Sequence, residues 1–258
     1  MIRPLEITSL TKSFGGKAVV KDFSAFIFPG EFVSLLGHSG CGKSTVLSII
    51  AGLQTATEGG VCIDGTEMVE PGLERALVFQ SPSLLPWLTA EENVILAVRQ
   101  AHPKLTRKQQ RDLAHKYIGL VGVGEFANQM PAELSQGTQQ RVAIARAFSL
   151  EPRFLLLDEP FGMLDSMTRF ELQDLLLELW ERDRKTVILV THDVDEAVYL
   201  SDRILLMTDG PEARLGKEIK IRMPRPRDRR AAAQSAEYLG LRNQVLEFLE
   251  HHTRQFAA

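Results

Sequence analysis

Four short apolar runs constrain the fold of this 258-residue chain more than any other feature of its sequence. They are Phe32 to Leu36, Ala76 to Phe79, Phe154 to Leu157 and Thr186 to Val190. Because these runs do not alternate polar with apolar residues, they predict strands buried on both faces, as in a parallel sheet covered by helices. The sequence is therefore expected to fold as an α/β protein.

Each run is followed by residues suited to phosphate chemistry. Those residues are Gly37 after the first run, Gln80 after the second, Asp158 and Glu159 after the third, and Thr191 and His192 after the fourth. Ligands of open parallel sheets bind beyond the carboxyl ends of the strands. The four runs therefore predict one shared site at that edge of the sheet.

The first run leads into a glycine-rich segment that fits the P-loop pattern G-x-x-x-x-G-K-[ST] and is followed by a helical pattern. Its residues are Gly37, His38, Ser39, Gly40, Cys41, Gly42, Lys43, Ser44 and Thr45. Glycines let backbone N–H groups turn toward phosphate oxygens, and the helix N-terminus adds its positive end. We expect Lys43 to reach the β and γ phosphates of ATP and Ser44 to bind Mg²⁺. His38 and Cys41 stand at variable positions and are expected to be spacers.

The acidic pair after the third run has a natural partner in magnesium. A carboxylate at the end of a buried strand is costly unless it is paired. Asp158 is expected to hold Mg²⁺ bound to ATP, while Glu159 accepts a proton from the attacking water. Gln80 is a candidate ligand of the metal or the water, and His192 a candidate contact of the γ phosphate. Solvated loop acids and a structural histidine are the plainer alternatives.

Between the second and third runs, the chain has helical patterns and no strand-like run. Thr89 with Glu92 and Thr106 with Gln109 form capping-box patterns, each of which opens a helix. Further along, Ser135 is a good N-cap and Gly137 permits a close backbone approach. This second helix N-terminus is either an ordinary capped helix or an anion site that completes the ATP site of a second subunit.

Composition excludes several other classes of protein. A formal net charge of -3 does not favour nucleic acid as a partner. Two cysteines, Cys41 and Cys62, fit a reducing cytosol better than a disulfide scaffold. We expect no signal peptide from Met1 to Glu6, and no apolar stretch has the ~18 residues that a membrane span needs. Another subunit is expected to supply any membrane-spanning part.

The order of these segments resembles that of the ATPase subunit of ATP-binding-cassette (ABC) transporters, from about residue 5 to residue 215. The matching motifs are the P-loop at 37–45, a Q-loop at Gln80, a signature at 134–140 that includes Ser135, Gln136, Gly137 and Gln140, a Walker B strand at 154–159, a D-loop with Asp165, and an H-loop at His192. Phe14 stands where this family places an aromatic ring that stacks on adenine.

The resemblance implies one ABC ATPase domain over residues 1–258. It has a P-loop NTPase core at 1–84 and 151–215, with a mostly parallel sheet and an antiparallel N-terminal β region. A helical subdomain at 85–150 is inserted into this core, and residues 216–258 form an extension. We expect the basic stretch Lys220 to Arg230 to be a solvated tail, closed by a helix near Tyr238 to Leu249.

The resemblance also implies the mechanism and the partners. Two ATPase subunits, identical or homologous, hold each ATP between the P-loop of one and the signature of the other. Their opening and closing drives two membrane-spanning permease subunits on the cytoplasmic face of the inner membrane, with a substrate-binding protein as an indirect partner. The segment Ser81 to Trp87 resembles the surface that grips a permease. Leu84, Leu85 and Trp87 either serve that contact or pack in the core.

The signature departs from the usual L-S-G-G-x-x-Q at Gln136, which is expected to alter the closed state slightly. Gln136, together with Gly162 to Ser166, is most similar to nitrate-type importers, and segments such as Ser83 to Trp87 are shared with sulfonate, taurine, cyanate and bicarbonate importers. The sequence thus favours a nitrate or nitrite importer ATPase, with those other anions as alternatives. A soluble ABC ATPase of translation or DNA repair and a non-catalytic nucleotide-binding module are further alternatives.

Overall fold

The structure is a computed structural model that describes residues 4–253, in two compact units. The first unit combines residues 4–72 with 186–253, and the second spans Leu73–Lys185. The prediction that Met1 to Glu6 form no signal peptide falls partly on Met1 to Arg3, which lie outside the described residues. Each unit is described separately below.

One sheet of the first unit is antiparallel, with strand order β2-β1-β4-β5. Its strands are β1 (Leu5–Phe14), β2 (Lys17–Ile27), β4 (Glu58–Ile63) and β5 (Thr66–Glu67). The turn between β1 and β2 consists of Gly15 and Gly16, both with positive φ, at 55° and 80°. Two such residues are what a two-residue hairpin of type I′ requires, and glycine adopts them without steric cost. This is the antiparallel N-terminal β region that the sequence predicts.

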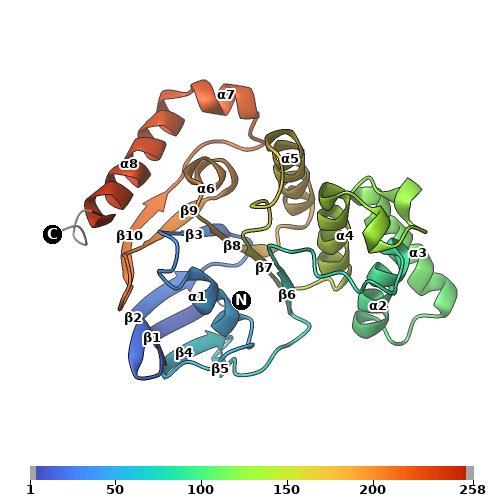
Figure 1. Ribbon diagram of the computed structural model, residues 1–258, viewed down its shortest axis with the longest axis horizontal. Helices are drawn as coiled ribbons and strands as arrows, with labels where there is room; N and C mark the ends of the chain where they lie inside the picture. The colour runs from blue at the N-terminus through green and yellow to red at the C-terminus, as the bar shows by residue number, and fades with distance from the viewer. Residues whose placement is uncertain (1–3, 254–258) are drawn as a thin grey trace. The chain divides into compact units, whose positions relative to one another are not determined.

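The other sheet of the first unit has the order β10-β9-β3-β8, in which β3 pairs in parallel with both β8 and β9. Its strands are β3 (Phe32–Leu36), β8 (Thr186–Thr191), β9 (Arg203–Met207) and β10 (Leu215–Lys220). Every residue of β3, β8 and β9 is buried, which confirms that the runs predicted at Phe32 to Leu36 and Thr186 to Val190 are strands covered on both faces. The helices of this unit are α1 (Lys43–Ile50), α6 (Val194–Leu200), α7 (Arg229–Gln234) and α8 (Ala236–Thr253), drawn in Figure 1.

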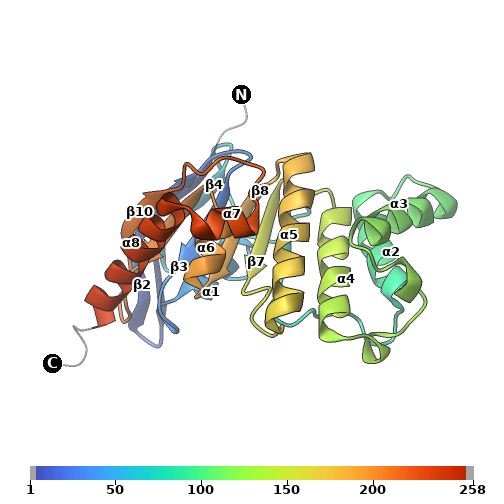
Figure 2. The same cartoon turned by 90° about the horizontal axis from the view of Figure 1, so that it is seen from above.

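The second unit contains two parallel strands and a group of helices. The strands are β6 (Arg75–Val78) and β7 (Phe154–Asp158); the helices are α2 (Ala90–Ala101), α3 (Arg107–Leu120), α4 (Gln136–Ser149) and α5 (Ser166–Asp183), with short 3₁₀ helices η1 (Gly124–Phe126) and η2 (Pro131–Glu133). Between β6 and β7 the chain forms helices alone, and within this unit α4 lies between α5 and the pair α2 and α3 (Figure 2). Both predicted capping boxes are present, at Thr89 and Thr106.

Two sequence predictions need correction. The second strand ends at Val78, and Phe79 is exposed rather than part of the buried run. The basic stretch is not a solvated tail. Arg225 donates to the carbonyl of Leu200 and pairs with Asp202, and Arg227 donates to the carbonyl of Tyr199. These arginines satisfy the last carbonyls of α6, which a helix end leaves without intrahelical partners.

The predicted fold class is confirmed: the molecule is an α/β protein with parallel strand pairs, an antiparallel N-terminal sheet and a helical insertion. The predicted C-terminal helix is confirmed as α8. Among residues 4–253, no helix is both long and apolar enough to cross a bilayer.

Candidate functional site

The P-loop joins β3 to α1 and is shaped by glycines that tolerate no side chain. Gly42 has φ 98°, and a Cβ there would lie 2.6 Å from Cγ2 of Val20. A Cβ at Gly37 would lie 2.9 Å from Sγ of Cys41. Cys41 is buried, which raises the pKa of its thiol, so it fills space beneath the loop as an uncharged group. The chain therefore doubles back tightly around the start of α1.

The start of α1 is suited to an anion. No side chain caps this helix and no acidic residue stands in its first turn, so its first N–H groups face no competing carboxylate within the helix. Lys43 is only 5% exposed, and its Nζ donates to the carbonyls of Gly37 at 2.8 Å and His38 at 2.9 Å. The loop thus holds an ammonium group at its centre, while Ser44 is exposed and Thr45 half-buried.

Strand register brings His192 to the same edge as the P-loop. Leu36 of β3 pairs with Thr191 of β8, and the residues that follow this pair are Gly37 and His192. The turn after β8 is fixed by Thr191, whose Oγ1 donates to Glu196 at 2.7 Å and accepts from the N–H of Asp193 at 3.0 Å. His192 is exposed on this turn. The first unit therefore places two of the predicted motifs side by side.

Phe14 ends β1 in the antiparallel sheet, with its ring about half exposed. The ammonium of Lys12 lies 5.1 Å from the ring centroid, within the range of a cation–π contact. An exposed aromatic face at a hairpin end is able to stack on a planar ligand.

In the second unit, the register of β6 and β7 brings Gln80 and the acidic pair together. Val78 pairs with Leu157, so the residues that follow these strands leave the sheet at one edge. A Cβ built on Gly162 would lie 3.1 Å from Nε2 of Gln80 and 3.7 Å from Oε2 of Glu159. The amide and the carboxylate therefore both lie close to the same side of this glycine, while Asp158 ends β7 itself.

The backbone of Glu159 is strained, with φ at 45°. A residue with a side chain adopts this conformation at a cost of ~1–3 kcal/mol, and such residues concentrate at functional sites. The turn is held by a hydrogen bond of 3.1 Å from the N–H of Gly162 to the carbonyl of Glu159. Sequence reasoning gave no sign of this strain.

The predicted signature forms the N-terminus of α4. Ser135 is the N-cap, and its Oγ accepts from the N–H of Thr138 at 3.2 Å. Ser135 and Gln136 are exposed, whereas Gly137 is buried, and a Cβ there would lie 2.5 Å from Cγ2 of Thr168 on α5. The close approach predicted for Gly137 is therefore present, and it is made to α5 of the same unit.

Gln140 differs from its neighbours in the signature. It is 1% exposed, and its Nε2 donates to the carbonyl of Phe79 at 3.2 Å. Its side chain points into the second unit and holds the start of the segment that follows β6. Ser135 and Gln136 of the signature are therefore exposed, whereas Gln140 is not.

Asp165 is the N-cap of α5 and accepts from the N–H groups of Met167 and Thr168 at 3.0 and 3.1 Å. Hydrogen bonds from Thr168 and then Met167 lower the pKa of this carboxyl. Its charge also suits the positive end of the helix. The structure thus gives the D-loop aspartate a part in forming its own helix.

Two residues that the sequence did not single out, the buried Asn93 and the half-buried Arg146, fix the segment Ser81 to Trp87. Nδ2 of Asn93 donates to the carbonyls of Leu85, Leu88 and Thr89, and the guanidinium of Arg146 donates to those of Pro82 and Ser83. Trp87 is 68% exposed, and Leu84 and Leu85 are half-buried. Core packing is therefore not the role of Trp87 in this chain.

Comparison with known proteins agrees with these motifs. A sequence profile of the family described as ABC transporter matches residues 20–162. The chain is 46% identical over 235 residues to the nitrate import ATP-binding protein NrtD of Synechococcus elongatus, which covers 91% of this chain and 86% of that protein. It is 44% identical over 235 residues to the bicarbonate transport ATP-binding protein CmpD of the same species, covering 91% and 84%.

Other matches are longer proteins or solved structures. The chain is 48% identical over 241 residues to the nitrate import ATP-binding protein NrtC of Synechocystis, but spans only 36% of that protein. A dimeric post-hydrolysis structure of the ATP-binding cassette MJ0796, bound to ADP and Pi, matches with a TM-score of 0.75 and 36% identity, over 85% of this chain and all of that one. The chain belongs to the ABC transporter family and is one of its ATP-hydrolysing subunits.

Proposed function

We propose that this ATPase energises the import of a small inorganic anion, with nitrate as the preferred substrate and bicarbonate as the alternative. The observation that carries the proposal is the match to NrtD, which runs through 91% of this chain at 46% identity. CmpD matches the same share at 44%, a difference too small to separate the two anions. The nitrate-type pattern of Gln136 with Gly162 to Ser166 supports nitrate.

Within the ATP site, each predicted residue has a proposed part. The P-loop binds the phosphates through its N–H groups and Lys43, and the ring of Phe14 stacks on adenine. Mg²⁺ accepts oxygen ligands and keeps much of its shell for phosphates and water. The hydroxyl of Ser44, the amide oxygen of Gln80 and the carboxylate of Asp158 are donors of that kind. The metal would neutralise charge on the phosphates when bound.

Glu159 and His192 are the residues that we propose to act on the attacking water and the γ phosphate. Glu159 accepts the proton of the water from its position directly after the end of β7, where its backbone is strained. His192 contacts the γ phosphate from the turn after β8. The proximity of the Gln80 amide and the Glu159 carboxylate around Gly162 supports a shared function for these two residues.

A second ATPase subunit, identical or homologous, is the proposed partner of the α4 N-terminus. Ser135 and Gln136 are exposed there, and a shallow helix end holds an anion better when a second surface closes over it. Met163 and Met167, which flank the exposed Asp165, are also exposed, as suits an interface. The matched cassette MJ0796 was solved as a dimer with ADP and Pi.

We assign the segment Ser81 to Trp87 to the contact with one of the two membrane-spanning permease subunits of the transporter. Asn93 and Arg146 hold this segment from beneath, so that Trp87 is presented on a rigid support. The subunit would then sit on the cytoplasmic face of the membrane, with a substrate-binding protein as an indirect partner. Nucleic acid has no place in this assembly.

The test is a chromosomal Glu159→Gln substitution, with Glu125→Gln as a matched control at an exposed position in the same unit. Uptake of labelled nitrate and labelled bicarbonate is measured, together with taurine. We expect nitrate uptake to fall to background while the other two continue. Loss of bicarbonate uptake alone would show that bicarbonate, and not nitrate, is the imported anion. Normal uptake of all three in cells that make the stable variant would contradict an importer of this class.

A further inference from the structure

His38 is the P-loop residue that the nucleotide chemistry leaves without a role. Its Nε2 lies 3.1 Å from the carbonyl oxygen of Leu249, a residue of α8 that is 211 positions further along the chain. Because a carbonyl only accepts hydrogen bonds, Nε2 must be the protonated nitrogen of this ring. The side chain is 39% exposed, so water competes with this bond only in part. A helix at the end of the chain therefore holds the P-loop by a side chain.

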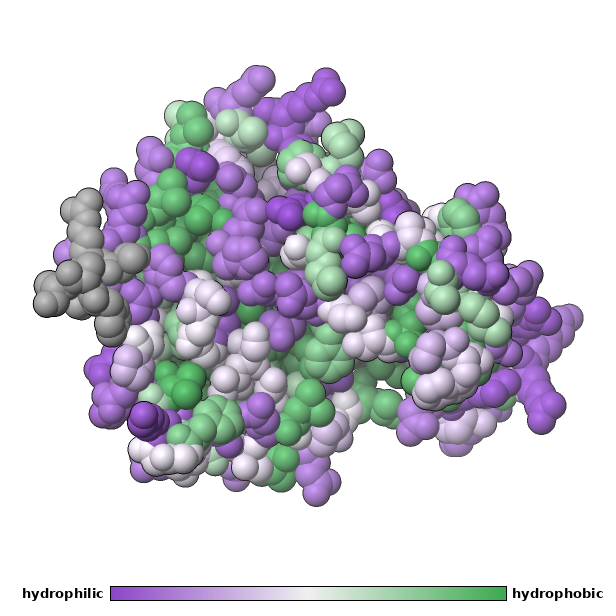
Figure 3. All heavy atoms as spheres, in the orientation of Figure 1, coloured by the Kyte–Doolittle hydropathy of each residue, from purple (hydrophilic) through white to green (hydrophobic). Residues whose placement is uncertain are grey.

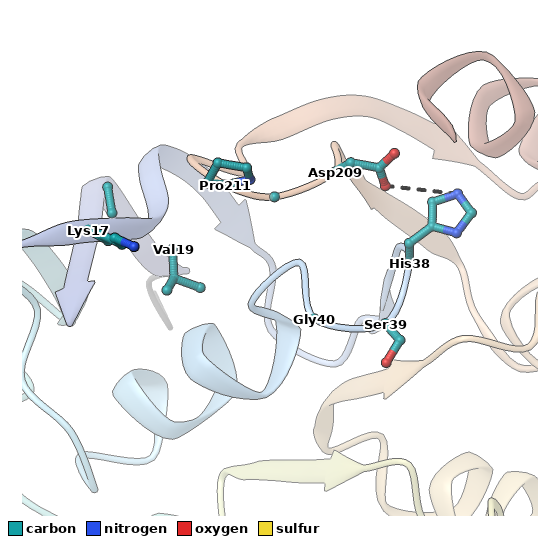
Figure 4. Close-up of a pocket in the computed structure, with 9 residues that line it drawn as sticks. Lys17, Val19, His38, Ser39, Gly40, Asp209 and Pro211 are labelled. Carbon is teal, nitrogen blue, oxygen red and sulfur yellow. Dashed lines mark ion pairs between the residues drawn. The ribbon is translucent and has the colours of Figure 1, made fainter. Parts of the chain in front are cut away.

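Asp209 also lies near Nε2 of the His38 imidazole. Its Oδ1 is buried and lies 3.9 Å from Nε2 of His38, too far for a hydrogen bond but close enough for electrostatic attraction. Figure 4 shows the two side chains facing each other above the P-loop. Both line an open pocket of about 590 Å³ formed by segments 17–19, 38–40 and 209–211.

α8 is firmly attached to the first unit. Asp195 of α6 accepts from Tyr238 at 2.8 Å and from Arg242 at 3.0 Å, and Val245 is fully buried. Nearer the P-loop contact, Phe248 packs against Gly216 so closely that a Cβ there would lie 2.5 Å from its Cζ. Figure 3 shows hydrophobic residues beside the position that α8 has in Figure 1. A helix fixed in this way is able to restrain what it binds.

We propose that α8 positions the P-loop through His38, so that nucleotide binding and the order of the last turns of α8 are coupled. This proposal rests on the proposed function of the P-loop as the phosphate site. His38 is held at both ends: its side chain by α8, and its carbonyl by Nζ of Lys43 at 2.9 Å. A loop that is already fixed loses less entropy when it binds its ligand. Coupling of this kind is reciprocal, so nucleotide must in turn steady α8.

The first experiment measures binding of Mg·ADP and the steady-state KM and kcat for ATP in the full-length chain. A neutral hydrogen bond contributes about 0.5–1.5 kcal/mol, so we expect His38→Ala to raise Kd and KM roughly 3–10-fold, with kcat changed less than about twofold. His38→Gln places an amide N–H the same number of bonds from the backbone and should restore most of the affinity. His251→Ala, an exposed histidine of α8, is the matched control and should behave as wild type.

The second experiment measures the coupling at α8, by hydrogen exchange. Mg·ADP should slow hydrogen exchange in residues 246–253 of the wild type, and should not do so in His38→Ala. Phe248→Ala loosens α8 without a change in the P-loop and should weaken ADP binding in the same direction. Unchanged affinity for Mg·ADP in both His38→Ala and Phe248→Ala would overturn the coupling between α8 and the P-loop, and would leave the proposed function of the P-loop intact. A wild-type chain that binds no Mg·ADP would overturn both the coupling and the proposed function.

Discussion

We propose that two helix N-termini in this chain bind phosphate, and they are built differently. α1 begins inside the P-loop, and no side chain caps it. The buried Lys43 places its ammonium group at the centre of that loop. α4 begins at an exposed serine whose oxygen already accepts from the N–H of Thr138. A loop that surrounds its ligand binds alone, whereas an open, capped helix end needs a second surface. The difference supports our proposal that one chain contributes half of each of two ATP sites.

The largest expected effect comes from removal of the ammonium group at the P-loop. Lys43→Ala takes away a buried cation whose charge-assisted hydrogen bonds are worth ~1.5–3 kcal/mol each. We expect ATP affinity, measured by equilibrium binding, to fall about 100-fold. If affinity fell by less than about threefold, the P-loop would not be the primary site and the comparison would fail. Thermal unfolding with no nucleotide present checks that the variant is folded.

A methyl group added at Gly137 tests the packing beneath the α4 N-terminus. The Cβ of Gly137→Ala would meet Cγ2 of Thr168 at 2.5 Å, so overpacking should lower the free energy of unfolding by about 1–3 kcal/mol, measured with urea. Thr168→Ser removes that methyl group, and the double variant should regain most of the stability. A double variant as unstable as Gly137→Ala would show that the contact with α5 is not the cause.

Loss of the serine cap separates a structural role from a functional one. Ser135→Ala should lower the free energy of unfolding by about 1 kcal/mol. Thr89 is a matched control, because it caps α2 with the same geometry and Thr89→Ala should cost about as much. Only the Ser135 variant is expected to lose ATPase activity, measured at equal protein concentration. Equal ATPase activity in both variants would make α4 an ordinary capped helix.

The smallest effect concerns pH and the cap of α5. The pKa of Asp165 is lowered in the folded chain, so its charge stabilises the fold above the unfolded pKa of about 4, and this contribution is lost as pH falls through the folded value. Asp165→Asn removes this titration. The urea midpoints of wild type and variant should therefore differ at pH 7 and converge toward pH 3. A difference that stayed constant over this range would contradict the assignment.

Local patterns in the sequence predicted much of the fold and of the candidate site. Strand runs, capping boxes and the P-loop are read within ten residues, and the structure has them where they were expected. Contacts between distant segments were missed, because no local pattern encodes them. The carbonyl of Leu249 bound by His38 and the carbonyls of α6 capped by Arg225 and Arg227 are of this kind.

Gln140 illustrates the same limit within a motif. The resemblance placed Gln140 with Ser135 in the signature, but Gln140 lies five positions after Ser135, and the helix turns its side chain toward the carbonyl of Phe79. A residue one turn into a helix lies on a face that only the packing of its neighbours determines. The signature motif therefore predicted the helix that contains Gln140 but not the direction in which its side chain points.

Sedimentation of the Glu159→Gln variant tests whether the α4 N-terminus completes its site only against a second cassette. This variant should bind ATP and hydrolyse it slowly. We expect one chain per particle without nucleotide and two chains with ATP and Mg²⁺. Addition of the Ser135→Ala substitution should return the particle to one chain. A particle that stays a single chain with saturating ATP, or that is a dimer regardless of ATP and of Ser135, would contradict this proposal.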